Sequence, residues 1–149
     1  MNLEHCLEKI KQAHYPAPPL ADAGLVIERW ELEQGITLPP DMKSFYGHMN
    51  GCRLFDKLDP SYNFLSLEMV ARARVMIFGR DLDTDGPADL YAFCSVRDGN
   101  YVAFNGRQPS GCLDCFHETF GEVESRRITE SFTEFLIKAL SSGSRLFWL

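Results

Sequence analysis

Apolar residues recur at helical spacing in the first third of the chain and predict three helices there. Leu3, Leu7 and Ile10 share one face of a first helix over 3–14. The prolines between residues 16 and 19 end that helix, because proline lacks the amide donor and restricts the residue before it. A second helix over 22–34 places Trp30 on its apolar face, and Gly35 is suited to close it in the left-handed conformation.

The third predicted helix is marked at both ends by residues with special backbone properties. Pro39 and Pro40 stand where a helix tolerates proline, in its first turn. Asp41 adds negative charge at the positive end of the helix dipole. Asn50 and Gly51 are predicted to end the helix, with a positive φ at the glycine. Between them lies one apolar stripe, made of Met42, Phe45, Tyr46 and Met49.

The remainder of the chain reads as a run of short strands closed by one helix. We predict a short strand at 52–56 and a second strand near 62 that enters a helix at about Ser66. A hairpin is predicted over 91–105, and one or two further strands between 111 and 128. The last helix, over 131–140, begins with the capping-box pair Ser131 and Glu134. The order predicts a single α+β domain spanning 1–149, with helices packed on a mostly antiparallel or mixed sheet. The apolar segment 144–149 either folds back onto the core or docks elsewhere.

Composition and charge narrow the classes of function. The 149 residues suit one domain with a sizeable core, and the formal net charge is −6. This charge argues against nucleic-acid binding, which needs cationic side chains, and weakly favours a basic partner. No segment has the length and apolar character of a membrane span, and the N-terminal helix lacks the pattern of a signal peptide. We therefore predict a cytoplasmic protein, and the oligomeric state stays open.

The five cysteines do not predict a disulfide framework, because their number is odd and the expected compartment is reducing. Cys112, Cys115 and His117 have the spacing of half a structural zinc site, but no second ligand pair accompanies them. The alternative is a strand in which Cys112 and Asp114 face one side of a sheet while Leu113 and Cys115 face the other. We expect no metal and no cofactor.

The segment Asp81–Gly86 matches the first half of a calcium-binding EF-hand loop. Asp81, Asp83 and Asp85 alternate as calcium ligands do, but the twelfth position, where a bidentate glutamate belongs, is Ala92. Calcium binding therefore remains one alternative. A second is a solvated acidic turn, and a third is a charged surface, together with Asp89, that steers a basic partner.

No catalytic set can be assembled from the sequence. The four histidines fall in no recognisable motif, and no glycine-rich phosphate loop follows a strand. Glu118, Glu122 and Glu124 are available as paired carboxylates, but a charged turn explains them equally well. We predict that the protein is not an enzyme.

The segment 27–51 resembles the signature of the SUKH superfamily. In that signature a helix with a glutamate and a glycine precedes Leu-Pro, an acidic residue, a helix with an aromatic residue, and Asn-Gly. The later order of strands and helix also agrees, so the resemblance covers about 22–140. It implies an α+β fold and no catalysis. The matching positions here are Glu33, Gly35, Leu38, Pro39, Asp41, Phe45, Asn50 and Gly51.

The superfamily includes bacterial immunity proteins, which neutralise toxins that are often nucleases, and yeast cell-wall-synthesis regulators. The resemblance therefore implies an immunity protein that binds a cognate toxin, or alternatively a non-enzymatic scaffold or regulator. The toxin-binding surface of the superfamily is too variable to transfer residue by residue. We expect a basic toxin to meet the acidic side chains Asp81, Asp83, Asp85, Asp89, Glu28 and Glu31.

Overall fold

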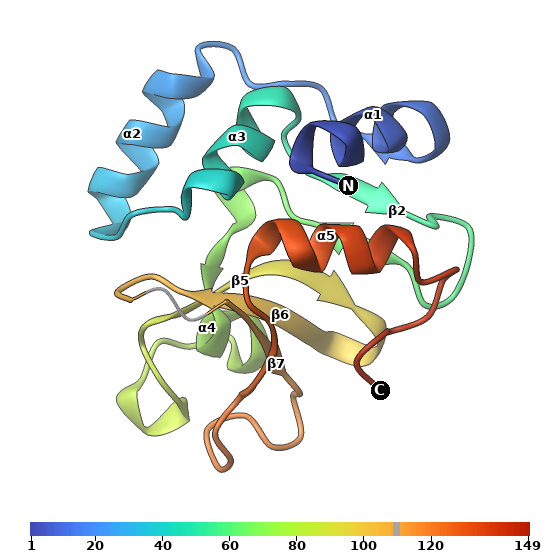
Figure 1. Cartoon of the computed structure of the whole chain (residues 1–149). Helices are drawn as coiled ribbons and strands as arrows, with labels where there is room; N and C mark the ends of the chain where they lie inside the picture. Colours follow the sequence, from blue (N-terminus) through green and yellow to red (C-terminus); the bar gives the residue numbers. More distant parts are fainter. Residues whose placement is uncertain (109–110) are drawn as a thin grey trace.

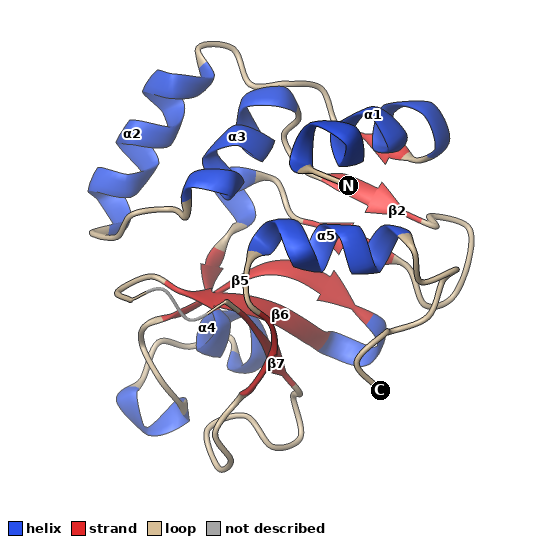
Figure 2. Cartoon of the chain, in the orientation of Figure 1, coloured by secondary structure: helices blue, strands red, loops and turns tan. Residues whose placement is uncertain are grey.

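The computed structural model describes residues 1–108 and 111–149 and shows helices packed on both faces of an antiparallel sheet (Figure 1, Figure 2). The α-helices in these residues are α1 (Leu3–Ala13), α2 (Ala23–Gln34), α3 (Pro40–His48), α4 (Ala73–Phe78) and α5 (Phe132–Leu140). The strands are β1 (Tyr15–Pro16), β2 (Cys52–Leu54), β3 (Tyr62–Phe64), β4 (Ala71–Arg72), β5 (Leu90–Val96), β6 (Asn100–Asn105), β7 (Cys112–Cys115) and β8 (Arg126–Thr129). The architecture is α+β, as the order of elements predicted.

The sheet is built around the long hairpin of β5 and β6. Its strand order is β1-β2-β3-β5-β6-β7-β8, and β4 pairs with the first half of β5 beside β3. The register shifts between Ala92 and Cys94, so β5 contains a bulge at Phe93. As a result Phe93 and Cys94 both contribute to the same core, whereas strict alternation would place them on opposite faces.

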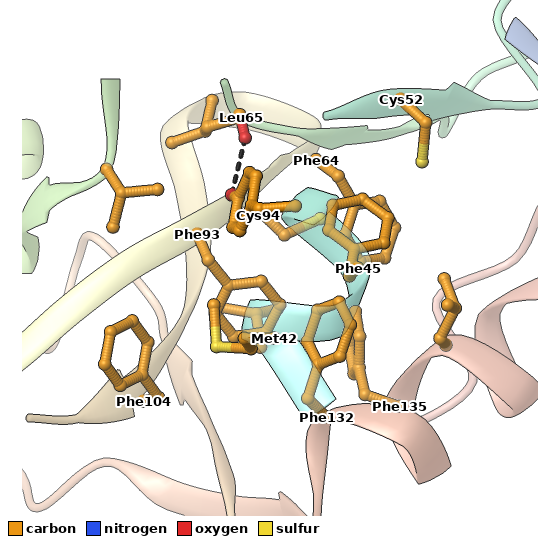
Figure 3. Close-up of a cluster of buried hydrophobic side chains, with 14 of the residues drawn as sticks. Met42, Phe45, Cys52, Phe64, Leu65, Phe93, Cys94, Phe104, Phe132 and Phe135 are labelled. Carbon is orange, nitrogen blue, oxygen red and sulfur yellow. Dashed lines mark hydrogen bonds between the residues drawn. The ribbon is translucent and has the colours of Figure 1, made fainter. Parts of the chain in front are cut away.

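The two faces of the sheet carry cores of different size. The larger core lies under α1, α2, α3 and α5, and the smaller lies under α4 (Figure 1). Aromatic rings form the centre of the larger core (Figure 3). The Phe45 ring lies 5.0 Å from that of Tyr46, 5.2 Å from that of Phe132 and 5.9 Å from that of Phe64, measured between centroids. The first two pairs are edge-to-face and the third is tilted, and together they pack α3 against α5 and β3.

Four predicted helices and the central hairpin are confirmed. Ser131 caps α5 through its Oγ, which accepts from the Glu134 amide at 3.1 Å. The reciprocal bond differs from the predicted capping box, because the Glu134 carboxylate accepts from the amide of Glu130 instead of that of Ser131. β7 alternates as expected, with Cys112 in the larger core and Leu113 and Cys115 in the smaller one.

Two predictions on element boundaries are wrong. The helix expected from Ser66 begins only at Ala73, because the chain first makes a 3-10 turn at Leu67–Met69 and then pairs β4 with β5. α3 ends at His48, since Met49 is already extended, so the Asn50-Gly51 pair lies beyond the helix. Gly51 does have the expected positive φ of 93°, but it serves the turn into β2.

The apolar segment 144–149, here called the tail, folds back onto the core. The Trp148 ring lies 5.8 Å from that of Phe135 and 6.2 Å from that of Tyr62. The Tyr62 hydroxyl also donates to the carbonyl of Arg145. These contacts decide the open alternative for the tail in favour of packing within the same chain.

Candidate partner-binding surface

The polar residues at the end of α2 hold the connection to α3. The Glu31 Oε2 accepts from the Leu38 amide at 2.7 Å and lies 3.3 Å from the Lys43 Nζ. The amide of Gly35, which has a φ of 71°, donates to the Glu31 carbonyl and closes α2. Glu33, which the sequence pattern assigned to the signature, is exposed. Glu31 is therefore the glutamate that acts in the fold, and the assignment to Glu33 is corrected.

The acidic and amide residues of α3 and its exit join distant segments. The Asp41 Oδ2 accepts from the amide and the Oγ1 of Thr133, each at 2.9 Å, and so ties the start of α3 to the start of α5. The Asn50 Oδ1 accepts from the Leu67 amide at 2.8 Å, while its Nδ2 donates to Glu68. These bonds satisfy polar groups at helix and turn starts that would otherwise be left without partners.

The remaining signature positions are structural in the same way. Leu38 and Phe45 are buried, and Pro39 occupies the position just before the first residue of α3. A Cβ built on Gly51 would lie 2.5 Å from the Phe64 carbonyl oxygen, so only glycine allows this close approach. The signature makes the fold, and a binding surface must be sought in other residues.

The loop 81–89, here called the acidic loop, is organised around one buried arginine. Only 4% of the Arg74 side chain is exposed. Its Nε lies 2.6 Å from the Asp81 Oδ1, and its Nη1 lies 2.9 Å from the Asp83 Oδ1 and donates to the Gly86 carbonyl at 3.2 Å. This hydrogen bonding lowers the pKa of the Asp81 carboxyl. The arginine therefore sets the shape of the loop.

Three further arginines complete the charge balance of the acidic loop. Arg80 forms a bidentate pair with the buried Asp85: its Nε donates to the Oδ2 at 2.6 Å and its Nη2 to the Oδ1 at 3.0 Å. The Arg72 Nη1 donates to the Asp81 Oδ2 at 2.9 Å. Arg107 lies 3.2 Å from Asp89. Each predicted aspartate thus has an arginine partner. Asp83 nevertheless keeps 96% of its side chain exposed, so a carboxylate remains available at the surface.

A pocket of about 360 Å³ lies at the far end of the sheet, between the loop 116–125 and the tail. Its floor includes Asp114 of β7 and Asn100 at the start of β6. The Asn100 Oδ1 accepts from the His117 amide at 2.9 Å, which anchors the loop to the hairpin. The Arg126 Nη2 donates to the Trp148 carbonyl at 2.8 Å, which anchors the tail. We call this space the tail pocket.

The tail pocket combines a carboxylate with apolar walls. Burial raises the pKa of the Asp114 carboxyl, against the opposing effects of Arg126 and of a hydrogen bond with the Trp148 side chain. Phe116, Val123 and Leu149 line the pocket and keep 39%, 62% and 87% of their surface exposed. The sequence analysis placed Asp114 on the same face of a strand as Cys112, but it assigned no binding role to Asp114.

Comparison with protein families bears directly on these features. The sequence model of the SMI1/KNR4 family (SUKH-1) matches residues 25–138, which is most of the chain. This chain belongs to the SMI1/KNR4 family. The matched range contains the signature residues, the acidic loop and the floor of the tail pocket, whereas the tail lies outside it. A search of curated proteins found no match.

The SMI1/KNR4 fold places the two acidic clusters expected from the sequence on different elements. Asp81, Asp83 and Asp85 follow α4, whereas Glu28 and Glu31 belong to α2 on the other side of the sheet (Figure 1). Glu28 is exposed, while Glu31 is engaged with Leu38 and Lys43. The two clusters therefore remain separate among the described side chains.

The thiols of this SMI1/KNR4 protein are buried. Burial raises the pKa of Cys112 and of Cys115 to about 12, so both stay protonated and unreactive at neutral pH. Across 1–108 and 111–149, no group of three or more His, Cys, Asp or Glu side chains is placed to hold a metal ion. The helices in the same ranges include none long and apolar enough to cross a bilayer.

Calcium is expected to leave the melting temperature of the protein unchanged. A cation in the acidic loop would have to displace guanidinium groups that already neutralise Asp81, Asp83 and Asp85. Thermal melting with calcium and with a chelator checks this. A stabilisation by calcium of several degrees that Asp83→Ala abolishes would instead make the loop a calcium site.

Proposed function

We propose that this SMI1/KNR4 protein is a non-catalytic immunity protein of the cytoplasm, which binds a basic toxin directly and blocks it. Family membership over most of the chain supports this role. One structural observation carries it further. The polar groups of the signature are engaged within the fold, whereas carboxylates and an apolar pocket outside the signature face solvent.

Charge supports a basic partner in preference to an acidic one. The chain has a net charge of −6, and Asp83 and Glu28 present exposed carboxylates on separate elements. Fixed negative charge accelerates association with a basic protein, and salt weakens the effect. The carboxylates of Asp81 and Asp89 are already paired with arginines, so they add less negative charge to the surface. Asp85 and Glu31 contribute through the shape of the fold, since their carboxylates are engaged internally.

The alternative role is a scaffold or regulator of the cell-wall-synthesis-regulator type. The prediction from the sequence that the protein is not an enzyme suits that role as well. The two roles differ in their partner: a toxin encoded beside an immunity protein in one case, and a resident cellular protein in the other. Co-expression separates them.

Co-expression with the toxin of an adjacent gene is expected to restore growth, and the two proteins are expected to copurify as a complex. Growth should recover because the protein binds the toxin directly and blocks it. Cells with toxin alone are the control, and growth curves with affinity copurification are the measurement. An abundant, folded protein that gives no protection, or a genome position without a toxin gene, would exclude the immunity role and favour the scaffold.

The same complex tests the charged surface. The double variant Asp83→Asn and Glu28→Gln removes two exposed carboxylates and leaves the Arg80–Asp85 pair intact. Stopped-flow mixing should show slower association at low salt and little difference at high salt. Association at the wild-type rate would place the binding face elsewhere without affecting the proposed role.

A further inference from the structure

The tail pocket is the strongest unassigned feature of the molecule. It is enclosed on three sides: by the floor of β6 and β7, by the loop 116–125 and by the tail. Each wall is held by a bond to another segment. Asn100 holds the loop, Arg126 holds the tail, and the Trp148 ring packs on the core. The pocket is therefore formed before any partner arrives.

Among the described residues, the carboxylate on the floor is not held in an ion pair, although Arg126 also lines the pocket and its charge opposes the rise that burial causes in the pKa of Asp114. Arg126 is the cross-strand neighbour of Asp114, but its guanidinium bonds to the Trp148 carbonyl instead. No ion pair found in the described part of the chain includes Asp114. This is the opposite of the acidic loop, where each aspartate has an arginine. A half-buried carboxylate that no ion pair holds favours a ligand that brings a cation into direct contact with it.

The walls restrict what kind of cation fits. Phe116 and Trp148 offer aromatic surface beside Asp114, and Val123 and Leu149 leave apolar surface exposed at the rim. A guanidinium is planar, stacks on aromatic rings and donates two parallel hydrogen bonds to a carboxylate, whereas an ammonium is more strongly hydrated. The volume of about 360 Å³ is near the lower end of the range for ligand sites and suits one or two side chains.

We propose that the tail pocket binds an arginine side chain of the partner protein, with the apolar residue next to that arginine resting on Phe116, Val123 and Leu149. This inference rests on the proposed function, because it names the contact by which a basic toxin is recognised. Arginines in preformed pockets are typical energetic anchors of protein interfaces. The pocket then supplies specificity, while the exposed carboxylates on other elements supply long-range attraction.

The test uses acetyl-Leu-Arg-amide, with acetyl-Leu-citrulline-amide as the uncharged probe of the same shape. The chain has two tryptophans, and their indole N–H signals in a ¹H–¹⁵N NMR spectrum provide an internal comparison. Trp148 lines the pocket, whereas Trp30 belongs to α2. We expect the arginine peptide to shift the Trp148 indole and the amides of 114–126 and to leave Trp30 unchanged. The citrulline peptide is expected to bind at least about tenfold more weakly, because the charge-assisted bond is lost.

Two variants separate the charge from the apolar walls. Asp114→Asn keeps the shape of the side chain and removes its charge. It is expected to lower the affinity for the arginine peptide about tenfold and to leave the affinity for the citrulline peptide unchanged. Val123→Ser should lower the affinity for both peptides, because it removes apolar surface from the wall of the pocket. Asp22→Asn is the matched control, since Asp22 is exposed on the other side of the molecule and its positive φ of 52° is one that asparagine tolerates. An unchanged Trp30 signal verifies that each variant is folded.

Several results would overturn the proposal: equal binding of the two peptides, shifts outside the pocket, or concentration-dependent shifts of these resonances without peptide, which would indicate a second copy of the chain. The peptide assay is independent of the toxin. If protection fails while the pocket binds the arginine peptide, the immunity role is wrong and the pocket stands. If Asp114→Asn protects and binds toxin as the wild type does, the role stands and the pocket contact is wrong.

Discussion

Phe45→Ala is expected to lower the free energy of unfolding by about 3–5 kcal/mol, the usual cost of removing a fully buried phenylalanine ring. Phe45 has no exposed surface and pairs with the rings of Tyr46, Phe64 and Phe132 (Figure 3). These partners belong to β3, α3 and α5, so no single element is able to close the cavity. The loss is a large share of the stability of a domain of this size.

Urea unfolding measures this change, with the dependence on denaturant compared between variants to verify that the transition stays two-state. Leu32→Ala is the control, because 78% of Leu32 is exposed and its removal should cost about 0.5 kcal/mol or less. A loss of under about 1 kcal/mol in Phe45→Ala would mean that the core refills the space, and that the contacts of α3 do not depend on this ring.

Gly51→Ala is expected to destabilise the protein by at least about 2 kcal/mol, from backbone strain together with a steric clash. The φ of 93° is unfavourable for any residue with a Cβ. The new Cβ would also lie 2.5 Å from the Phe64 carbonyl oxygen and 3.0 Å from the Leu65 carbonyl carbon. The neighbouring backbone is not free to shift, since the Gly51 carbonyl accepts from the Ala17 amide at 3.0 Å.

Gly35→Ala provides a matched comparison for the strain alone. Gly35 has a φ of 71°, and no atom lies within 4 Å of a Cβ built on it. It should therefore cost only the strain, about 1 kcal/mol. Thermal and urea unfolding of the two variants check the difference. Equal losses would show that the approach of Gly51 to β3 is not the reason for a glycine there.

The predictions that succeeded concern local backbone structure. The apolar stripe of α3, the prolines before it and the glycine after α2 each act through neighbours in the sequence, so spacing alone identifies them. The helix predicted at Ser66 failed for the opposite reason. Residues 71–72 pair with β5, and the hydrogen bonds of a distant strand outweigh a local helical pattern there.

The candidate site was only partly predictable from the sequence. The alternation of Asp81, Asp83 and Asp85 correctly indicated a turn, but the same spacing also fits a calcium loop or a free acidic patch. Their arginine partners follow from the packing of α4 and β4 against β5. Glu31 and Glu33 are equally acidic in the sequence, and only the position of α3 places Leu38 and Lys43 beside Glu31.

The sequence by itself determined the ends of most helices, the central hairpin, the α+β class and the family. These depend on backbone preferences and on which face of an element is apolar, and both are set within a few residues. Only the tertiary structure decided which carboxylates are engaged and which are free. Asp41 meets Thr133, and Asp89 meets Arg107, across long stretches of chain. In the described residues Asp114 forms no ion pair, since the guanidinium of its cross-strand neighbour Arg126 donates to the Trp148 carbonyl, a contact that exists only once the chain is folded.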